Sequence, residues 1–248
     1  MVFISDLDDT IIFSGKKING KRVCVEKKDE IEISYMTDIS AELFKQIIEK
    51  AMFIPITTRS PEQYGRIVFP GGYKPKYAVI DNGAALLIDG IPDKEWRRRS
   101  EKIAADCRSE LEKFRLRLEK IVGNSSKVKY SDNIFIYTKH TNCNDVMKKL
   151  LSDAEPEKVS VFNGGNKLYV IPKEINKKIA FENLKSKLQE KFIVAAGDSE
   201  LDKDFLAEAD IALIKYGILS GRQINKNQIC EQFPDNDFVL KNVKKYLN

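Results

Sequence analysis

The chain has 248 residues, of which 42% are hydrophobic and 32% are charged; this composition excludes a disordered chain and predicts a globular protein of one large or two modest domains. Its 42 basic and 37 acidic residues are largely interspersed, so the net charge of +5 favours a solvated surface over a nucleic-acid groove. Apolar runs fall short of the roughly 18 residues of a membrane helix, and Asp6 and Asp8 interrupt the N-terminal run before a signal peptide could form, so we expect a cytoplasmic protein without nucleic-acid or membrane partners.

The first elements are predicted to be a strand and a hairpin. Residues 2–7, VFISDL, indicate a short buried strand, because the apolar run is too short for a helix. Residues 16–36 hold two β-like runs and an Asn19-Gly20 turn signal, which predict a hairpin or flap.

A helix and a second strand follow. Asp38 or Ser40 can cap the helix. Residues 52–57 predict the second buried strand, and Ser60 before Pro61 indicates the start of its helix, since serine caps and proline suits the first turn.

The pattern changes after the third strand, residues 76–83. Residues 96–122 form a long charged pattern with helical periodicity, which we interpret as one helix with a solvated face. The strands and helix that follow indicate an α+β unit of its own, and we place this second domain at residues 85–167.

Strand and helix alternation then resumes. A helix over 176–191, a strand over 192–199, a helix over 201–208 and a strand over 209–214 are predicted. This alternation implies an α/β fold with a parallel, doubly wound sheet, into which the α+β unit is inserted.

The cysteines and the single histidine do not suggest a metal or redox site. Cys24, Cys107, Cys143 and Cys230 contain no CxxC spacing, and His140 cannot complete a zinc set alone. We interpret the four cysteines as buried or surface thiols.

Polar residues that directly follow buried strands should converge, because the binding crevice of an open parallel sheet lies at the carboxyl ends of its strands. The sequence places these residues there: Asp6 and Asp8 after the first strand, Thr57 and Arg59 after the second, Asn82 after the third, Asp198 and Asp202 after a later strand, and Lys177 at the start of the helix before it.

Each residue type suits phosphoryl transfer. Clustered carboxylates repel unless a cation neutralises them, and their oxygens suit Mg²⁺ when a substrate phosphate completes the shell. An aspartate can attack phosphorus to give an aspartyl-phosphate, and Asp8 can act as acid and base. Thr57 and Lys177 would supply a donor and a positive charge to the phosphoryl oxygens.

Four segments in order resemble the motifs of the haloacid dehalogenase superfamily of phosphohydrolases. They are DLDDT from Asp6, TTRS from Thr57, NKKIA from Asn176 and GDSELD from Gly197. The insertion after the DNGA segment resembles the C2-capped branch that includes the Cof-like and sucrose-phosphate phosphatases. The resemblance implies a Rossmann-like catalytic core, residues 1–84 and 168–248, and a C2-type cap, residues 85–167.

The resemblance also implies a catalytic role for each matching residue. Asp6 would be the nucleophile, and Asp8 the general acid for the leaving alkoxide and then the base for water. Thr57 and Lys177 would bind the transferring phosphoryl group. For substrate binding we predict Thr57, Arg59, Asn82 and Lys177.

A magnesium ion is the implied cofactor. Asp6, the backbone carbonyl of Asp8 and Asp198 would hold it, with Asp202 as a further ligand or a supporting carboxylate. By strand alternation, Asp9 points elsewhere and is interpreted as a structural acid of the turn.

The chain departs from the family pattern at two positions. The family usually has TGR where this chain has TTR, so Thr58 is an alternative to Thr57. Leu201 replaces the asparagine that relatives commonly carry in the fourth motif, which leaves the substrate type open.

The lysine also has competitors, Lys173 and Lys178. We choose Lys177 because it lies three residues before Ala180, as the family's lysine does in its K-G-x-A pattern.

The function predicted is a phosphatase acting on a small phosphorylated metabolite such as a sugar phosphate. A phosphomutase shares the aspartyl-phosphate step but usually carries a smaller cap soon after the first motif. A receiver-like phospho-acceptor needs only about half this length. No feature of the sequence indicates an oligomeric state.

Overall fold

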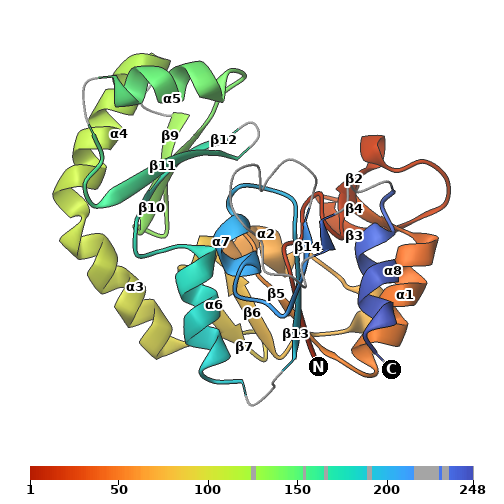
Figure 1. Ribbon diagram of the computed structural model, residues 1–248. Helices are drawn as coiled ribbons and strands as arrows, with labels where there is room; N and C mark the ends of the chain where they lie inside the picture. Colours follow the sequence, from red (N-terminus) through yellow and green to blue (C-terminus); the bar gives the residue numbers. More distant parts are fainter. Residues whose placement is uncertain are drawn as a thin grey trace. The chain divides into compact units, whose positions relative to one another are not determined.

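The computed structural model divides into two compact units, Met1–Asp93 with Lys177–Asn248, and Lys94–Asn176, which we name the core unit and the cap unit (Figure 1). Among the residues it describes, no helix is long and apolar enough to cross a membrane. The described residues are 1–123, 127–152, 155–164, 167–188, 192–214, 229–230 and 235–247.

A parallel sheet forms the centre of the core unit. Its strand order is β15-β14-β13-β1-β5, and each neighbouring pair is parallel. The register places Phe3 opposite both Phe53 and Val194. The strands are β1 (Val2–Ser5), β5 (Met52–Pro55), β13 (Ile193–Gly197), β14 (Ile211–Ile214) and β15 (Ile229–Cys230).

Helices cover both faces of this sheet. On one face lie α1 (Asp38–Ile48) and α8 (Phe238–Lys245), side by side, and on the other lie α6 (Lys177–Lys185) and α7 (Lys203–Leu206) (Figure 1). Phe3 of β1 belongs to the same buried apolar cluster as residues of α1 and α8. Because successive strand residues point to opposite faces of a sheet, these two helices pack on the face to which Phe3 points. The predicted doubly wound α/β core is therefore confirmed.

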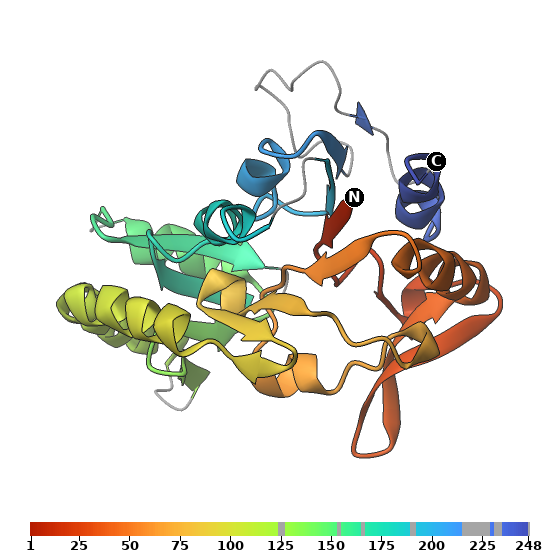
Figure 2. The same ribbon diagram turned by 90° about the horizontal axis from the view of Figure 1, so that it is seen from below.

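A three-stranded flap precedes α1. It consists of β2 (Phe13–Ser14), β3 (Arg22–Lys28) and β4 (Ile31–Thr37) in the order β2-β4-β3, and the β3–β4 hairpin is long (Figure 2). Its turn is at Asp29 and Glu30, whose φ angles are 50° and 63°. The hairpin was predicted. The prediction that Asn19-Gly20 marks its turn was wrong, because this pair precedes β3 and the turn lies between β3 and β4.

Local capping fixes the helix starts. Thr37 caps α1 by accepting a hydrogen bond from the Ser40 backbone N–H at 2.9 Å, which corrects the predicted caps Asp38 and Ser40. Ser60 caps α2 (Pro61–Gly65), as predicted, and its cap is a complete capping box with Gln63.

The third strand leaves the central sheet. Strand β6 (Tyr77–Ile80) lies beside β5, and Ile56, directly after β5, forms an isolated parallel bridge with Val79 of β6. The ladder partner of β6 is instead β7 (Ala85–Ile88), to which it pairs antiparallel, and β7 pairs with β8 (Ile91–Pro92). The 3-10 helices in the core unit are η1 (Gly15–Lys17), η2 (Pro70–Gly72) and η3 (Asp81–Gly83).

The cap unit is an antiparallel sheet packed against helices. Its strand order is β11-β12-β10-β9, and its apolar cluster joins α4 and α5 to the sheet. The helix predicted over 96–122 is broken at Cys107, whose backbone is not helical. The elements are α3 (Lys94–Asp106), α4 (Arg108–Val122), β9 (Val128–Ser131), β10 (Phe135–Lys139), α5 (Cys143–Leu151), β11 (Val159–Gly164) and β12 (Lys167–Pro172).

The boundaries between the units lie downstream of the predicted 84/85 and 167/168. Strand β7 starts at Ala85 and pairs with β6, so it belongs to the core unit. Strand β12 pairs with β10 and β11, so it belongs to the cap unit. Strand pairing between distant segments decides both positions.

Candidate active site

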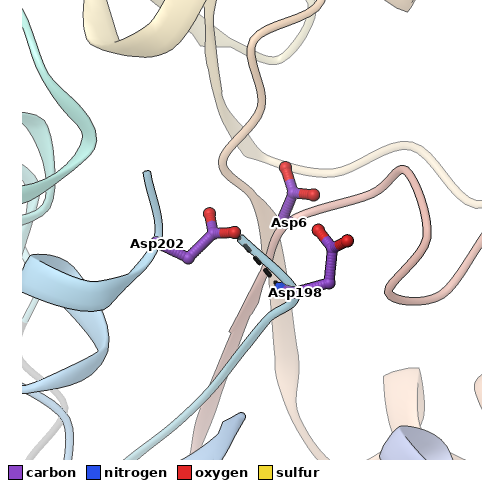
Figure 3. A group of neighbouring side chains, drawn as sticks. All are labelled: Asp6, Asp198 and Asp202. Carbon is purple, nitrogen blue, oxygen red and sulfur yellow. Dashed lines mark hydrogen bonds between the residues drawn. The ribbon is translucent and has the colours of Figure 1, made fainter. Parts of the chain in front are cut away.

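Three carboxylates meet at the carboxyl edge of the central sheet. Asp6 directly follows β1, Asp198 directly follows β13, and Asp202 lies in the turn that begins α7 (Figure 3). One oxygen of each lies within 4.8 Å of one oxygen of each of the others. Three of the residues predicted from strand ends, Asp6, Asp198 and Asp202, are therefore brought together.

Lys177 bridges two of these carboxylates. Its Nζ donates to Asp6 Oδ1 at 2.7 Å and to Asp202 Oδ1 at 2.6 Å, and the side chain is 1% exposed. Of the competing lysines, Lys173 donates to a cap carbonyl oxygen and Lys178 faces surface glutamates. The geometry thus favours Lys177.

Charge and burial oppose each other in this cluster. Burial lowers the pKa of Lys177, but Asp202 and Asp6 outweigh it and hold that pKa above its usual value, so the lysine is charged. Burial raises the pKa of Asp6 well above its usual value; Lys177 lowers it, and the carboxylates of Asp202, Asp198 and Asp8 raise it. One lysine does not balance the clustered acids, and a further cation would.

Asp202 is saturated by donors. Its Oδ1 accepts from Lys177, and its Oδ2 accepts from Ser199 N at 2.9 Å and Ser199 Oγ at 2.7 Å. Oδ2 also accepts from Asp198 N at 3.2 Å (Figure 3). The residue is fully buried. These contacts fit a carboxylate that supports Lys177 better than one that binds a metal directly. Ser199 was not predicted, although it lies within the fourth motif.

Gly197 is required by the close approach of Asp202. A Cβ at this position would lie 2.4 Å from the Asp202 Cβ. Any side chain here would push the supporting carboxylate away from Lys177.

The donor set fits a magnesium ion. Mg²⁺ prefers carboxylate and carbonyl oxygens and keeps open positions for water or a phosphate. Asp6 Oδ2 makes no hydrogen bond with the described residues, and Asp198 lies beside it. The oxygen ligands and the excess negative charge are both those that a small divalent cation requires.

Asp8 lies apart from this cluster. Its side chain is 53% exposed. Arg59 forms a bidentate pair with it, in which Nε donates to Oδ2 and Nη2 donates to Oδ1, both at 2.8 Å. Strand β1 ends at Ser5, so the alternation used to place Asp6 and Asp8 on one side does not extend to Asp8. Asp9 has a φ of 58° and pairs with Lys17.

Arg59 is fully engaged by the protein. Besides Asp8, its Nη1 contacts Glu26 at 2.9 Å and the Gln63 carbonyl oxygen at 3.3 Å, and its Nη2 contacts Ser34 Oγ at 3.3 Å. Burial lowers the pKa of Arg59, but its hydrogen bonds to Asp8 and the charges of Asp8 and Glu26 raise that pKa above its usual value. Its donors are thus used by protein acceptors, which argues against the substrate-binding role predicted for Arg59.

Thr57 and Asn82 lie on neighbouring strand ends. Thr57 is fully buried; its Oγ1 accepts from Arg59 N at 3.2 Å, and its carbonyl accepts from Asn82 N at 2.9 Å. Asn82 adopts a φ of 57° and is buried. Its Oδ1 is a buried acceptor without a hydrogen-bond partner in the described part of the chain.

The model of the sucrose-6F-phosphate phosphohydrolase family matches residues 1–215, and the chain belongs to that family. The protein is therefore a phosphoric monoester hydrolase of the haloacid dehalogenase superfamily. The comparison with curated protein sequences gives no significant match.

Solved structures share the fold. A sucrose-phosphatase from Synechocystis sp., in complex with sucrose and phosphate, has a TM-score of 0.57 at 16% identity, covering 99% of this chain and 97% of that one. A haloacid dehalogenase-like hydrolase from B. subtilis has a TM-score of 0.58 at 15% identity, covering 99% and 100%. The C-terminal domain of trehalose-6-phosphate phosphatase from C. albicans has a TM-score of 0.56 at 11% identity, covering 99% and 91%.

Proposed function

We propose that the protein is a Mg²⁺-dependent phosphatase that hydrolyses a small sugar phosphate through an aspartyl-phosphate intermediate. One observation carries the chemistry: buried Lys177 joins Asp6 to Asp202 beside Asp198, at the edge of a parallel sheet. The sugar-phosphate class rests on the family and on the sucrose-phosphatase neighbour, which was crystallised with sucrose and phosphate. The expected cytoplasmic location stays a prediction.

The residues divide the reaction between them. An Asp6 oxygen forms a bond to phosphorus while the bond to the sugar oxygen breaks, and Asp8 gives that oxygen a proton. Asp8 then takes a proton from water, which attacks phosphorus and releases Asp6 and inorganic phosphate. Lys177 and the Thr57 hydroxyl hold the phosphoryl oxygens, since catalysis of this transfer is mainly positioning and electrostatic stabilisation.

Asp6, the Asp8 backbone carbonyl and Asp198 would hold Mg²⁺, and Asp202 would support Lys177. When bound, the ion would offset the carboxylate charge and polarise a phosphoryl oxygen. Chelation is therefore expected to stop turnover, and added Mg²⁺ to restore it.

The test compares two aspartates of the same loop. Asp6→Asn is expected to lower kcat for para-nitrophenyl phosphate about a thousandfold or more, since it removes the nucleophile. Asp9→Asn is the matched control, because Asp9 pairs with exposed Lys17 and asparagine tolerates its positive φ. Wild-type turnover in Asp6→Asn would refute the assignment.

The product separates hydrolysis from mutase chemistry. A phosphatase releases inorganic phosphate from a sugar phosphate, whereas a phosphomutase returns an isomeric ester. We expect release of one phosphate for each ester consumed, across a panel of sugar phosphates with Mg²⁺ present. An isomeric phosphate ester as the main product would show that the mutase alternative is correct.

A further inference from the structure

A buried carboxylate in the flap has no role in the reaction so far. Glu26 lies on β3 and is 3% exposed, and its neighbour Val25 is buried too. Two consecutive strand residues normally point to opposite faces, but here the pairing register shifts on both sides of Glu26, at a β-bulge. The bulge turns the Glu26 side chain inward.

Glu26 meets donors on both of its oxygens. Oε2 accepts from Ser34 Oγ at 2.6 Å and pairs with Arg59 Nη1 at 2.9 Å. Oε1 pairs with Arg66 Nε and Nη2, both at 3.0 Å. A buried carboxylate with this many charged partners is held in one orientation.

Arg59 connects Glu26 to Asp8. Its Nη1 pairs with the buried Glu26, and its Nε and Nη2 donate two hydrogen bonds to the Asp8 carboxylate. A pair between two exposed side chains would be loose and worth little. Arg59, however, is only 9% exposed at its side chain and is fixed from the flap side, so it offers Asp8 a stationary partner.

We propose that Glu26 is a positioning residue for proton transfer: through Arg59, it sets where the Asp8 carboxylate stands relative to the leaving group. This rests on the role of Asp8 in the proposed function. Removing Glu26 should weaken protonation of the leaving oxygen and leave the attack by Asp6 intact.

Two aryl phosphates separate these effects. Phenolate is a poor leaving group that needs a proton, whereas para-nitrophenolate leaves without one. The comparison uses kcat/KM, which reports formation of the aspartyl-phosphate and does not include its later hydrolysis, in which Asp8 acts as the base for both substrates. We expect Glu26→Gln to lower kcat/KM about tenfold for phenyl phosphate and less than about twofold for para-nitrophenyl phosphate, because general acid catalysis contributes about 10²–10⁴-fold in enzymes.

Glu62→Gln is the matched control. Glu62 pairs with the same Arg66 at 3.0 Å, but its side chain is 81% exposed and it does not contact Arg59. This control should leave both rates unchanged. An equal loss of kcat/KM for both substrates in Glu26→Gln, or no loss of kcat/KM for either, would overturn the proposal.

Two further measurements keep the test decisive. If Glu26→Gln does not fold, Ser34→Ala replaces it, because this variant removes one hydrogen bond to Glu26 and one to Arg59. It should lower kcat/KM for phenyl phosphate more than for para-nitrophenyl phosphate. An equal change for the two substrates would overturn the proposal. The Arg59 Nε–H resonance is independent of turnover and should shift in Glu26→Gln. An unchanged resonance counts against the positioning role, whereas a wild-type protein that hydrolyses neither ester contradicts the proposed function.

Discussion

Gly197→Ala should damage the site through a single added methyl group. The new Cβ would lie 2.4 Å from the Asp202 Cβ and 2.7 Å from its Cγ. The two Cβ atoms, 2.4 Å apart, must separate by 1.0 Å to reach 3.4 Å, the distance at which ordinary van der Waals contact begins. Asp202 is fully buried behind the site, so its displacement moves the partner of Lys177 as well.

The expected loss follows from that displacement. Lys177 Nζ and Asp202 Oδ1 are 2.6 Å apart, so a retreat of the carboxylate by this amount breaks the bond unless the lysine follows it away from Asp6. A misplacement of about 1 Å at a reacting centre costs on the order of 10²-fold in rate. Overpacking a dense interior costs about 1–3 kcal/mol of stability.

Turnover of para-nitrophenyl phosphate and urea denaturation measure the two effects separately. Gly65→Ala is the matched control, because a Cβ there would meet no atom within 4 Å and its φ is not in the left-handed region. Alanine is also the better helix former, so this variant should keep full activity and equal or greater stability. Wild-type kcat in Gly197→Ala would refute the reasoning.

Three other changes test the site and the flap. Lys177→Met leaves two buried carboxylates without their counter-charge, so it should lower the free energy of unfolding by about 3–5 kcal/mol, measured by urea denaturation in the presence of a chelator. Added Mg²⁺ should restore part of this loss, and equal stability of the variant with chelator and with Mg²⁺ would contradict the reasoning. Thr57→Val should lower kcat/KM by about 10–100-fold, the value of a hydrogen bond to a charged group, and Thr58→Val should not; the opposite order would assign the role to Thr58. Glu30→Gly should raise the free energy of unfolding by about 1 kcal/mol, because its φ of 63° suits glycine, and a loss would contradict a strained turn.

The fold was predictable where local signals decide it. Apolar runs located β1, β5 and β13, and Ser60 located the start of α2. The helix break at Cys107 carries no proline or glycine, so periodicity alone ran through it. The boundaries of the cap unit depend on which distant strands pair, and a single sequence does not show this.

The site was predictable from one rule about parallel sheets. Strand ends converge, and the rule placed Asp6, Asp198 and Asp202 together before any distance was known. The role of Glu26 was not predictable in this way. In the sequence it belongs to an exposed, charged flap, and only the bulge and its two arginine partners bury it.

The two aspartates to which we assign chemistry are held by the same arrangement. Each pairs with a buried cation, Asp6 with Lys177 and Asp8 with Arg59. In both cases the same cation also pairs with a second, buried carboxylate. For Lys177 this carboxylate is Asp202, and for Arg59 it is a glutamate of the flap. A cation between two carboxylates is held from both sides, so each reactive acid is positioned in part by a carboxylate to which we assign no contact with the substrate. Variation at these supporting carboxylates should therefore alter kcat before it alters substrate affinity.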